Sequence, residues 1–478
     1  MSAVRLPLIF SLVLALTVAL GAAAFIAGSV EQPEGSPADE QTVFPTSLTE
    51  LPNTAAAPEL DILTWRTEAD TQVLFLPTHQ LPMVEARFTF NAGGARDGEQ
   101  AGIASLTNAM LDQGTSKYNV DDIAENIENL GAQLELGSYR DMAVVSLTSL
   151  SEPELLAQAT TLFTHLLAAP SFPQNSIERL RTRTVQRLKM QLQTPGPQLS
   201  RAFQAELFAH HPYGQPTLGT EESLAAITRS HLQAFHQRYY TAANATLAIV
   251  GDLTEQQARQ LSERLSQALP QGVAAPELPM ATVQPSKNLH LPFDSSQTHI
   301  TLGNQMIHRG HADYVPLYVG NHILGGSGFS AILMNQVRQQ RGLVYGIYSS
   351  VSPMAAAGPF TLQLQTANEN KDKALTLTLS LLQDFVAQGP TADQLELAIS
   401  DLTGGFALST ASNSALVGQL SAIGFYDLPL DYLADFHQAL GKVTAEDIKA
   451  AFARHLDPDN LVIVSIGPEA PQRVVEDE

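Results

Sequence analysis

The residues best suited to metal chemistry are the thirteen histidines of the chain. Cysteine is absent, which excludes disulfides and thiol catalysis and leaves histidine nitrogens and carboxylate oxygens as the available zinc ligands. The histidines that lie close together in sequence form three pairs: His210/His211, His231/His236 and His308/His311. No pair has a third ligand at helical spacing, so we expect these histidines to be core or surface residues.

A glycine-rich segment, Gly325-Gly326-Ser327-Gly328, is a candidate phosphate-binding loop. It lacks the lysine and the preceding apolar strand that such a loop needs. The sequence also contains no serine-centred nucleophile elbow and no kinase signature. These motifs therefore give no support to phosphoryl transfer or serine hydrolysis.

The composition describes a large, acidic, globular protein. A length of 478 residues exceeds what one hydrophobic core usually serves, so the chain is expected to be multidomain. Apolar residues make up 44% and charged residues 15%, which argues against disorder. The formal charge of -22 repels phosphate backbones, so nucleic acid is excluded as a partner.

The amino terminus predicts export or membrane anchoring. No charged residue occurs from Leu6 to Val30, and this apolar run is long enough to cross a bilayer as a helix. We interpret residues 1–30 as a signal anchor, with a cleaved signal peptide and a buried helix of a soluble protein as the alternatives. Arg5 precedes the run and acidic residues follow it, which places the bulk of the chain outside the cytoplasm. Residues 31–58, rich in Pro, Ser, Thr and Ala, are typical of a flexible linker.

Strands and long helices are expected to alternate after this linker. Residues 84–90 and 142–148 have strand-like patterns, and a helix is expected after Gly102. A second helix should begin at a capping Asn119 and end before Gly131. Ser151-x-x-Glu154 predicts a capping box that opens a third helix.

The helix and strand near residues 227–252 recur near residues 443–468. Asn244 and Gly251 return as Asn460 and Gly467 at the same offset, and residues 161–167 have an echo at 377–385. Two long copies indicate a duplicated domain and not a solenoid, which needs at least three shorter units. We therefore predict an N-terminal domain over residues 59–269, a linker over 270–286, a C-terminal domain over 287–470 and a tail over 471–478.

From about Leu60 to Pro468 the sequence resembles the insulinase/pitrilysin zinc metallopeptidases, which include bacterial processing proteases and the mitochondrial processing peptidase. The matching motifs occur in the family's order: residues 91–97 (NAGGARD), 102–104 (GIA), 110–115 (MLDQGT), 211–214 (HPYG), 219–220 (GT), 249–252 (IVGD), 324–327 (LGGS) and 341–345 (RGLVY). The resemblance implies an α+β fold of two homologous domains, each an antiparallel sheet backed by helices, facing each other around a peptide chamber. It also implies that Gly325 to Gly328 form a turn before a helix from Phe329 to Arg338.

The family's zinc motif is degenerate in this sequence. Relatives use His-x-x-Glu-His on a helix, which places two imidazoles on one face and a general base beside the metal-bound water. Ser105, Asn108 and Ala109 stand at the three motif positions. A further acidic ligand aligns with Gln186 or Arg187, in a helix expected from Ile177 to Leu192. None of these side chains can replace the ligand or base at its position, so we expect this chain to bind no zinc or other cofactor.

The second half keeps two residues that the resemblance assigns to substrate binding. Arg338 and Tyr345 have the family's spacing. By resemblance, Arg338 holds a main-chain carbonyl of the substrate and Tyr345 helps to stabilise the oxyanion. Some bacterial relatives divide the work between one chain that carries zinc and another that carries this pair.

The sequence therefore predicts a noncatalytic subunit, inactive alone, of a zinc metalloendopeptidase complex. The expected partners are a zinc-bearing sister peptidase subunit, with which it would form a heterodimer, and extended peptides. The expected location is the bacterial inner membrane on its periplasmic side, or the periplasm if the signal is cleaved. Two alternatives stay open: a scaffold or assembly protein with no role in proteolysis, and a peptidase that uses an unrecognised site.

Overall fold

A computed structural model describes residues 60–469. The predicted anchor or signal peptide at 1–30, the linker at 31–58 and the tail at 471–478 lie outside the described residues. The same holds for positions 59 and 470, at the outer ends of the two predicted domains. Within residues 60–469, no helix has both the length and the apolar character needed to span a bilayer.

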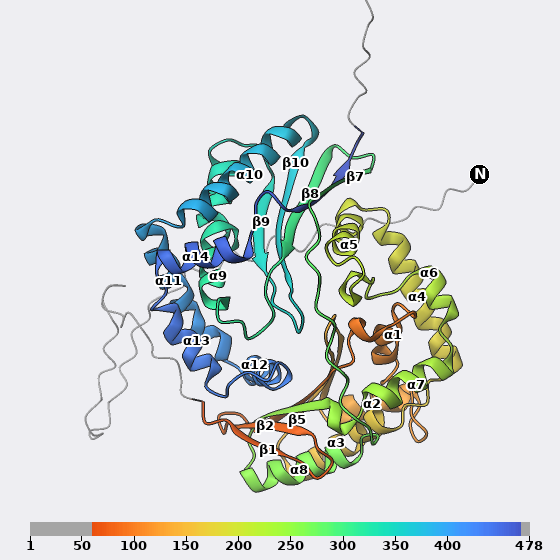
Figure 1. The fold of residues 1–478 in the computed structure, drawn as a ribbon. Helices are drawn as coiled ribbons and strands as arrows, with labels where there is room; N and C mark the ends of the chain where they lie inside the picture. The colour runs from red at the N-terminus through yellow and green to blue at the C-terminus, as the bar shows by residue number, and fades with distance from the viewer. Residues whose placement is uncertain (1–59, 470–478) are drawn as a thin grey trace, which may run out of the picture. The chain divides into compact units, whose positions relative to one another are not determined.

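The first half is built on a six-stranded sheet in the order β1-β2-β6-β3-β5-β4 (Figure 1). Its strands are β1 (Leu63–Arg66), β2 (Gln72–Pro77), β3 (Met83–Phe90), β4 (Gln133–Ser138), β5 (Ala143–Leu150) and β6 (Ala245–Gly251). Strand β6 is buried along its whole length, as expected of an apolar strand inside a sheet. The edge strand β4 alternates between more and less exposed residues.

Within the described residues, the first half contains eight α-helices, of which all but α5 cover one face of this sheet and form the core of the first half. They are α1 (Ile103–Ala109), α2 (Val120–Asn129), α3 (Pro153–Ala168), α4 (Gln174–Gln191), α5 (Pro195–Leu207), α6 (Glu221–Ala226), α7 (Arg229–Tyr239) and α8 (Glu255–Gln267), with short η2 (Gly94–Arg96), η3 (Pro212–Gly214) and η4 (Ala242–Asn244) between them. Apolar residues of α1, α3, α7 and α8 pack against those of β3, β5 and β6. The predicted cap is confirmed at Asn119, whose side chain accepts from two amides of α2.

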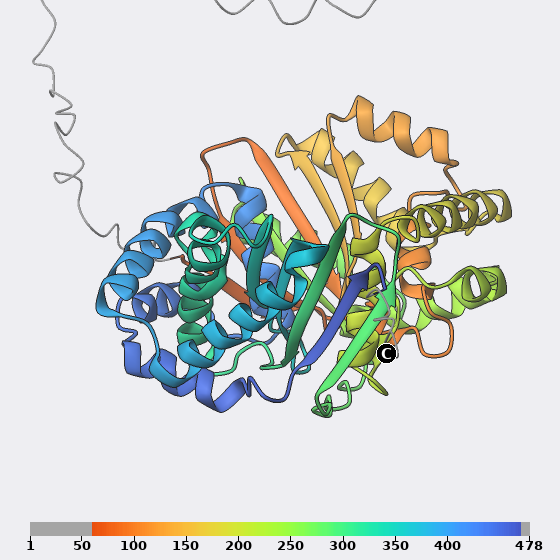
Figure 2. The same cartoon turned by 90° about the horizontal axis from the view of Figure 1, so that it is seen from above.

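The second half repeats this arrangement. Its sheet has the order β7-β11-β8-β10-β9, which matches β2-β6-β3-β5-β4 strand for strand. Its strands are β7 (Lys287–Pro292), β8 (Gln297–Gln305), β9 (Gly346–Val351), β10 (Pro359–Ala367) and β11 (Val462–Gly467). Figure 2 shows β11, in blue, between two green strands. The predicted fold of two homologous α+β domains is confirmed.

The helices of the second half follow the same plan. They are α9 (Tyr314–Asn321), α10 (Lys371–Gln388), α11 (Ala392–Phe406), α12 (Asn413–Phe425), α13 (Tyr432–Leu440) and α14 (Ala445–His455), with short η5 (His322–Gly326), η6 (Gly328–Ser330), η7 (Met334–Gln339), η8 (Asn368–Asn370) and η9 (Ala407–Thr410). Residues of α9, α10 and α14 form a core with β8, β9 and β10. Between α8 and β7 the chain has no helix or strand.

Each half contributes one helix to the sheet of the other half. Helix α12 packs on the first sheet, where Val417 and Leu420 contact a core that includes Leu74 and Val250. Helix α5 packs on the second sheet in a core that includes Val464. This exchange buries the second face of both sheets and joins the two halves.

Three local features differ from expectation. Each sheet contains one parallel pair, β2 with β6 and β7 with β11, so the sheets are largely but not wholly antiparallel. The cap of α3 is Glu152, which accepts from the Leu155 amide at 2.9 Å, because Pro153 takes the first helical position.

The third difference is the predicted helix from Phe329 to Arg338, which does not form as one α-helix. The chain makes a 3₁₀ turn, η6, and then the π-helical segment η7. The break falls at Ala331, whose backbone is extended (φ -67°, ψ 146°) and so cannot continue a helix.

Candidate functional site

The helix that carries the degenerate zinc motif, α1, is fixed by a buried carboxylate. Asp97 accepts hydrogen bonds from the amides of Gly102 at 2.7 Å and Ala104 at 2.9 Å. Burial raises the pKa of Asp97 to about 7, against the lowering effect of these two amides. Gly102 has φ 91°, and a Cβ there would lie 2.9 Å from the backbone of Gly219. Position 102 therefore requires glycine, and the helix start is held tightly against the loop at Gly219.

The motif positions on α1 have structural roles or none. Asn108 is only 3% exposed, and its Nδ2 donates to the Val144 carbonyl and the Tyr240 hydroxyl, both at 3.3 Å. Ser105 and Ala109 are half-buried on the same helix. An amide that donates hydrogen bonds cannot act as a general base, and an alanine offers no ligand atom. The residues at this site do not fit a zinc ion.

The positions expected to hold the remaining ligand point to solvent. Gln186 and Arg187 lie on α4, which begins at Gln174, three residues before the predicted start, and both are exposed. A cation and an amide in this place supply no carboxylate oxygen.

Arg338 and Tyr345 lie on either side of the turn that leads into β9. Arg338 is half-buried at the end of η7, with its guanidinium 5.4 Å from the centre of the Phe329 ring and its Nη1 3.8 Å from the Met334 sulfur. Tyr345 is 55% exposed, and its amide donates to the Gln365 carbonyl at 2.8 Å. Strand β9, which follows, is the edge of the second sheet.

Most of the histidines noted in the sequence have partners within the polypeptide. His211 accepts from the Tyr213 amide, and its Nε2 lies 2.9 Å from the Pro279 carbonyl. His236 donates from Nε2 to the Leu167 carbonyl at 2.8 Å, and burial lowers its pKa to about 4. His231 pairs with the Gln100 side chain at 2.9 Å.

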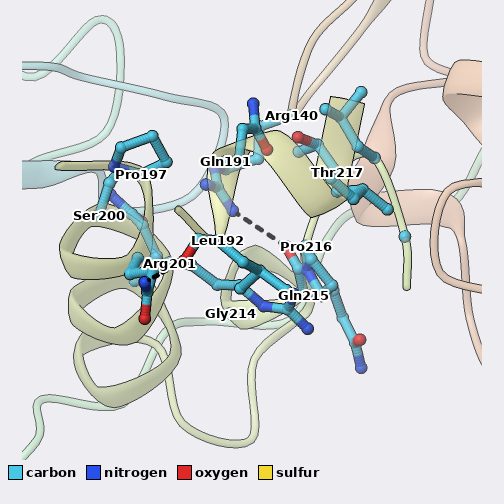
Figure 3. A pocket seen from close by; sticks show the side chains of 15 residues that line it. Arg140, Gln191, Leu192, Pro197, Ser200, Arg201, Gly214, Gln215, Pro216 and Thr217 are labelled. Carbon is cyan, nitrogen blue, oxygen red and sulfur yellow. Dashed lines mark hydrogen bonds between the residues drawn. The ribbon is translucent and has the colours of Figure 1, made fainter. Parts of the chain in front are cut away.

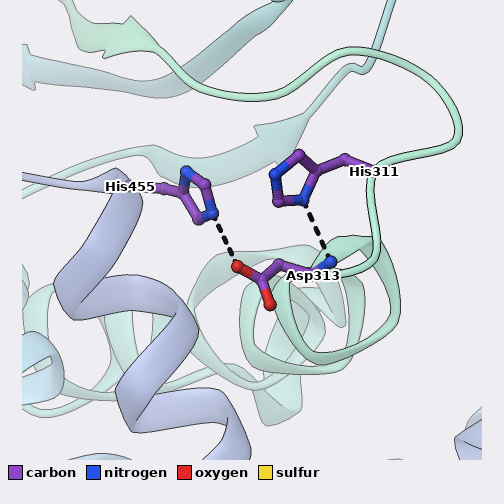
Figure 4. Close-up of side chains that lie close together, drawn as sticks. All are labelled: His311, Asp313 and His455. Atoms are coloured by element: carbon purple, nitrogen blue, oxygen red, sulfur yellow. Dashed lines mark hydrogen bonds and ion pairs between the residues drawn. The ribbon is translucent and has the colours of Figure 1, made fainter.

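One histidine cluster was not predicted. The fold brings together His311, Asp313 and His455, with ligand atoms within 4.8 Å of one another (Figure 4). His455 is 142 positions from Asp313, so no local spacing could reveal the group. However, Arg454 donates to both oxygens of Asp313, at 2.7 and 3.0 Å, and holds the pKa of this carboxyl below its usual range. The cluster is therefore an ion-pair network and not an open metal site.

Two cavities border the first half. A cavity of about 290 Å³ lies between the first sheet and α12, and its walls include Glu135, Tyr139 and Tyr426. A second, of about 230 Å³, lies between the end of α4, α5 and the loop at 214–219 (Figure 3). In that cavity Arg140 donates to the carbonyls of Tyr213 and Gln215. Its guanidinium is therefore already hydrogen-bonded to the backbone of this loop.

Comparison with known proteins agrees with this architecture. A profile described as insulinase (peptidase family M16) matches residues 73–221, and one described as peptidase M16 inactive domain matches residues 226–402. The crystal structure of a peptidase M16 inactive domain from Pseudomonas fluorescens is 40% identical, with a TM-score of 0.84, and the match covers 86% of this chain and 99% of that chain.

More distant relatives share the length of the described part. A protein of Helicobacter pylori named non-peptidase homolog YmxG is 26% identical over 403 residues, which cover 84% of this chain and 92% of the relative. An uncharacterized zinc protease of Mycobacterium bovis is 27% identical over 389 residues, 80% of this chain and 87% of the relative. The chain belongs to the insulinase (M16) peptidase family, as a peptidase-like member with a degenerate zinc motif.

Proposed function

We propose that this protein is a noncatalytic subunit of a zinc metalloendopeptidase complex. In this proposal a sister chain of the same family holds the zinc, and this chain completes the site with Arg338 and Tyr345. The observation that carries the proposal is the contrast between the two halves. Asn108 on α1 is committed to hydrogen bonds inside the fold, whereas the phenol of Tyr345 is 55% exposed beside an edge strand.

The chemistry of Arg338 and Tyr345 suits oxyanion stabilisation. A guanidinium and a phenol are both hydrogen-bond donors, and fixed donors near a developing oxyanion lower the barrier to acyl transfer. Packing against Phe329 restricts the guanidinium of Arg338, so less side-chain freedom would be lost when a carbonyl binds.

Extended peptides are the proposed ligands, bound by strand addition. Strand β4 is one of the two edge strands of the first sheet, and its residue Glu135 borders the cavity of about 290 Å³ beside α12. An added strand would receive main-chain hydrogen bonds from β4 whatever its sequence, while the cavity would accept alternate side chains.

We further propose export, with membrane anchoring as the preferred form. The support is the uncharged run from Leu6 to Val30 and the acidic residues beyond it. Carbonate washing should leave an anchored protein in the membrane fraction. Release of the whole protein, with a mature amino terminus near Gly28, would show cleavage instead.

The proposed function is tested by reconstitution with a family member from the same bacterium that has an intact His-x-x-Glu-His motif. Peptide hydrolysis by the pair is measured for the wild type, Arg338→Ala and Tyr345→Phe. Loss of one positioned oxyanion donor costs about 10²–10³ in rate, so turnover should fall sharply while association stays unchanged.

Arg341→Ala is the matched control. Arg341 lies three residues from Arg338, but its Nη1 donates to the backbone carbonyl and the side chain of Gln336, at 2.7 and 2.8 Å. Its replacement should affect turnover much less. If both target variants assemble and retain full activity, the shared-site proposal fails and a scaffold role replaces it.

A further inference from the structure

A cavity within the second half combines an aromatic wall with unpartnered polar atoms. Its volume is about 320 Å³, and helices α9, α11, α12 and α13 contribute to its lining. This volume is at the lower end of the range of roughly 300–1,000 Å³ for small-molecule pockets, so it suits a group the size of one aromatic amino acid. The cavity is separate from Arg338, Tyr345 and α1, none of which line it.

The apolar part of the wall is a cluster of rings around Phe436. The centre of the Phe436 ring lies 5.8 Å from Tyr314, 5.5 Å from Tyr318, 6.1 Å from Tyr432 and 6.5 Å from Phe406. Rings at these separations offer both faces and edges to a planar apolar group. A ligand with an aromatic or similar apolar body would gain contact area here.

The polar part of the wall is Arg309, whose guanidinium stands 5.2 Å from the ring of Tyr314 and 5.8 Å from that of Tyr426. Within residues 60–469, Arg309 forms no ion pair with a carboxylate. Its Nε is buried and has no hydrogen-bond partner among those residues. A donor that is removed from water without a partner costs free energy. Arg309 lines the cavity, so a rotation of its side chain toward an acceptor bound there would remove that cost.

A second unpartnered donor lies in the same wall. The hydroxyl of Tyr432 is buried and also lacks a partner in the described part of the chain. Burial raises the pKa of Tyr432 to about 12, so its hydroxyl keeps its proton at neutral pH. The lining also contains the acidic residue Asp401, which is exposed and forms an ion pair with His322 at 2.9 Å.

We propose that this cavity binds a small organic acid with an aromatic or apolar body, its carboxylate received by Arg309 and the hydroxyl of Tyr432. A guanidinium fork and one phenol match the two oxygens of a carboxylate, whereas a phosphate would require more donors. The body of the ligand packs among Tyr314, Phe406 and Phe436. The carboxylate can belong to a free acid or to the carboxyl terminus of a short peptide.

The test uses N-acetyl-L-phenylalanine and its methyl ester, titrated calorimetrically into the full chain. The acid should bind saturably at one site per chain, and the ester, which lacks the charge, should bind at least about tenfold more weakly. Arg309→Gln should weaken binding of the acid by a similar factor, and Tyr432→Phe, which keeps the ring, by about three- to tenfold. Arg341→Gln, a change at an arginine outside the cavity, should leave binding unchanged.

A peptide with a free terminal carboxylate, Ala-Ala-Phe, distinguishes the two sources of the ligand. Binding as tight as that of the acid points to peptide termini, and exclusion of the peptide points to a free acid. The proposal is overturned if the acid does not bind saturably, or if acid and ester bind alike to the wild type. The comparison of acid and ester needs no variant, so it decides the question even if Arg309→Gln does not fold.

Discussion

The Asp141 carboxylate in the first half accepts a hydrogen bond from the Tyr426 hydroxyl in the second half at 3.1 Å. The same carboxylate accepts from the Tyr213 hydroxyl and, at 2.8 Å, from the Ala355 amide. Tyr213 in turn accepts from the Ala356 amide at 2.9 Å. Asp141 is buried, so this group of hydrogen bonds connects the β4–β5 turn, the loop before β10 and the end of α12 in a site shielded from water.

Tyr426→Phe is expected to destabilise the protein by about 1.5–3 kcal/mol, the usual worth of a hydrogen bond to a charged group. Burial and the nearby charge of Asp141 raise the pKa of Tyr426, so its hydroxyl is a donor throughout the neutral range. Urea unfolding measures the change. Tyr345→Phe, at an exposed ring, is the control and should leave stability unchanged; equal stability of the two variants would contradict a role for the Asp141 contact.

Leu420→Ala is expected to destabilise both halves, because α12 belongs to the second half but packs on the first sheet. A buried leucine truncation costs about 2–5 kcal/mol. The single tryptophan of the chain, Trp65, lies in β1 and packs against Phe75, so its fluorescence reports unfolding of the first half.

The Trp65 transition should therefore move to lower urea concentration in Leu420→Ala, although the substitution lies in the other half. Leu408→Ala is the matched control, because Leu408 is 78% exposed. An unchanged Trp65 midpoint in Leu420→Ala would mean that the helix exchange does not couple the halves.

The local elements could be predicted from sequence because each one depends on neighbouring residues. Alternation in residues 84–90 is enough to predict β3, and Asn119 is enough to predict the start of α2. The duplicated fold can be predicted because Asn244 and Gly251, which flank a strand in the first half, recur at a constant offset as Asn460 and Gly467. The cap of α3 was misplaced because Pro153 fixes the first helical turn one residue later than Ser151-x-x-Glu154 suggests.

Contacts between the halves could not be predicted in this way. The composition of residues 413–425 shows that α12 is apolar but not that Leu74 and Val250 of the other half cover it. The partners of Asp141 and the lining of the Arg309 cavity come from segments far apart in sequence. At the candidate site, sequence identified the lost ligands, whereas the hydrogen bonds of Asn108 required the fold.

His236 is expected to make the protein sensitive to acid. Its imidazole is buried, stacks 5.1 Å from the ring of Tyr240, and has a pKa lowered to about 4 by burial. Above pH 6.5 the ring is neutral in both the folded and the unfolded states. Below that value the unfolded chain takes up a proton first, so the free energy of unfolding decreases as the pH falls from 6.5 to about 4, by up to about 3 kcal/mol.

His236→Gln removes this titration while a side-chain amide can still donate to the Leu167 carbonyl. Urea unfolding of both proteins at pH 7 and pH 4 separates the histidine from the carboxylates, which titrate alike in the two. The difference in stability between wild type and variant should shift in favour of the variant at pH 4. A difference that is independent of pH would show that His236 titrates normally in the fold.

Ser105→His combined with Ala109→His is expected to create a zinc site that does not support catalysis. The two positions are four residues apart on α1, so two imidazoles there share one helix face and can grip one ion. The wild type should hold no stoichiometric zinc and hydrolyse no peptide alone. The double variant should bind one zinc per chain only weakly in a titration, because it supplies two of the three or four protein ligands that a zinc site uses. Hydrolysis should stay absent, because Asn108 cannot accept a proton from water and its amide is held by the Val144 carbonyl.

Ser105→His alone is the control and should bind zinc more weakly than the pair. Tight zinc in the wild type, removed by chelation together with peptidase activity, would contradict the degenerate-site interpretation.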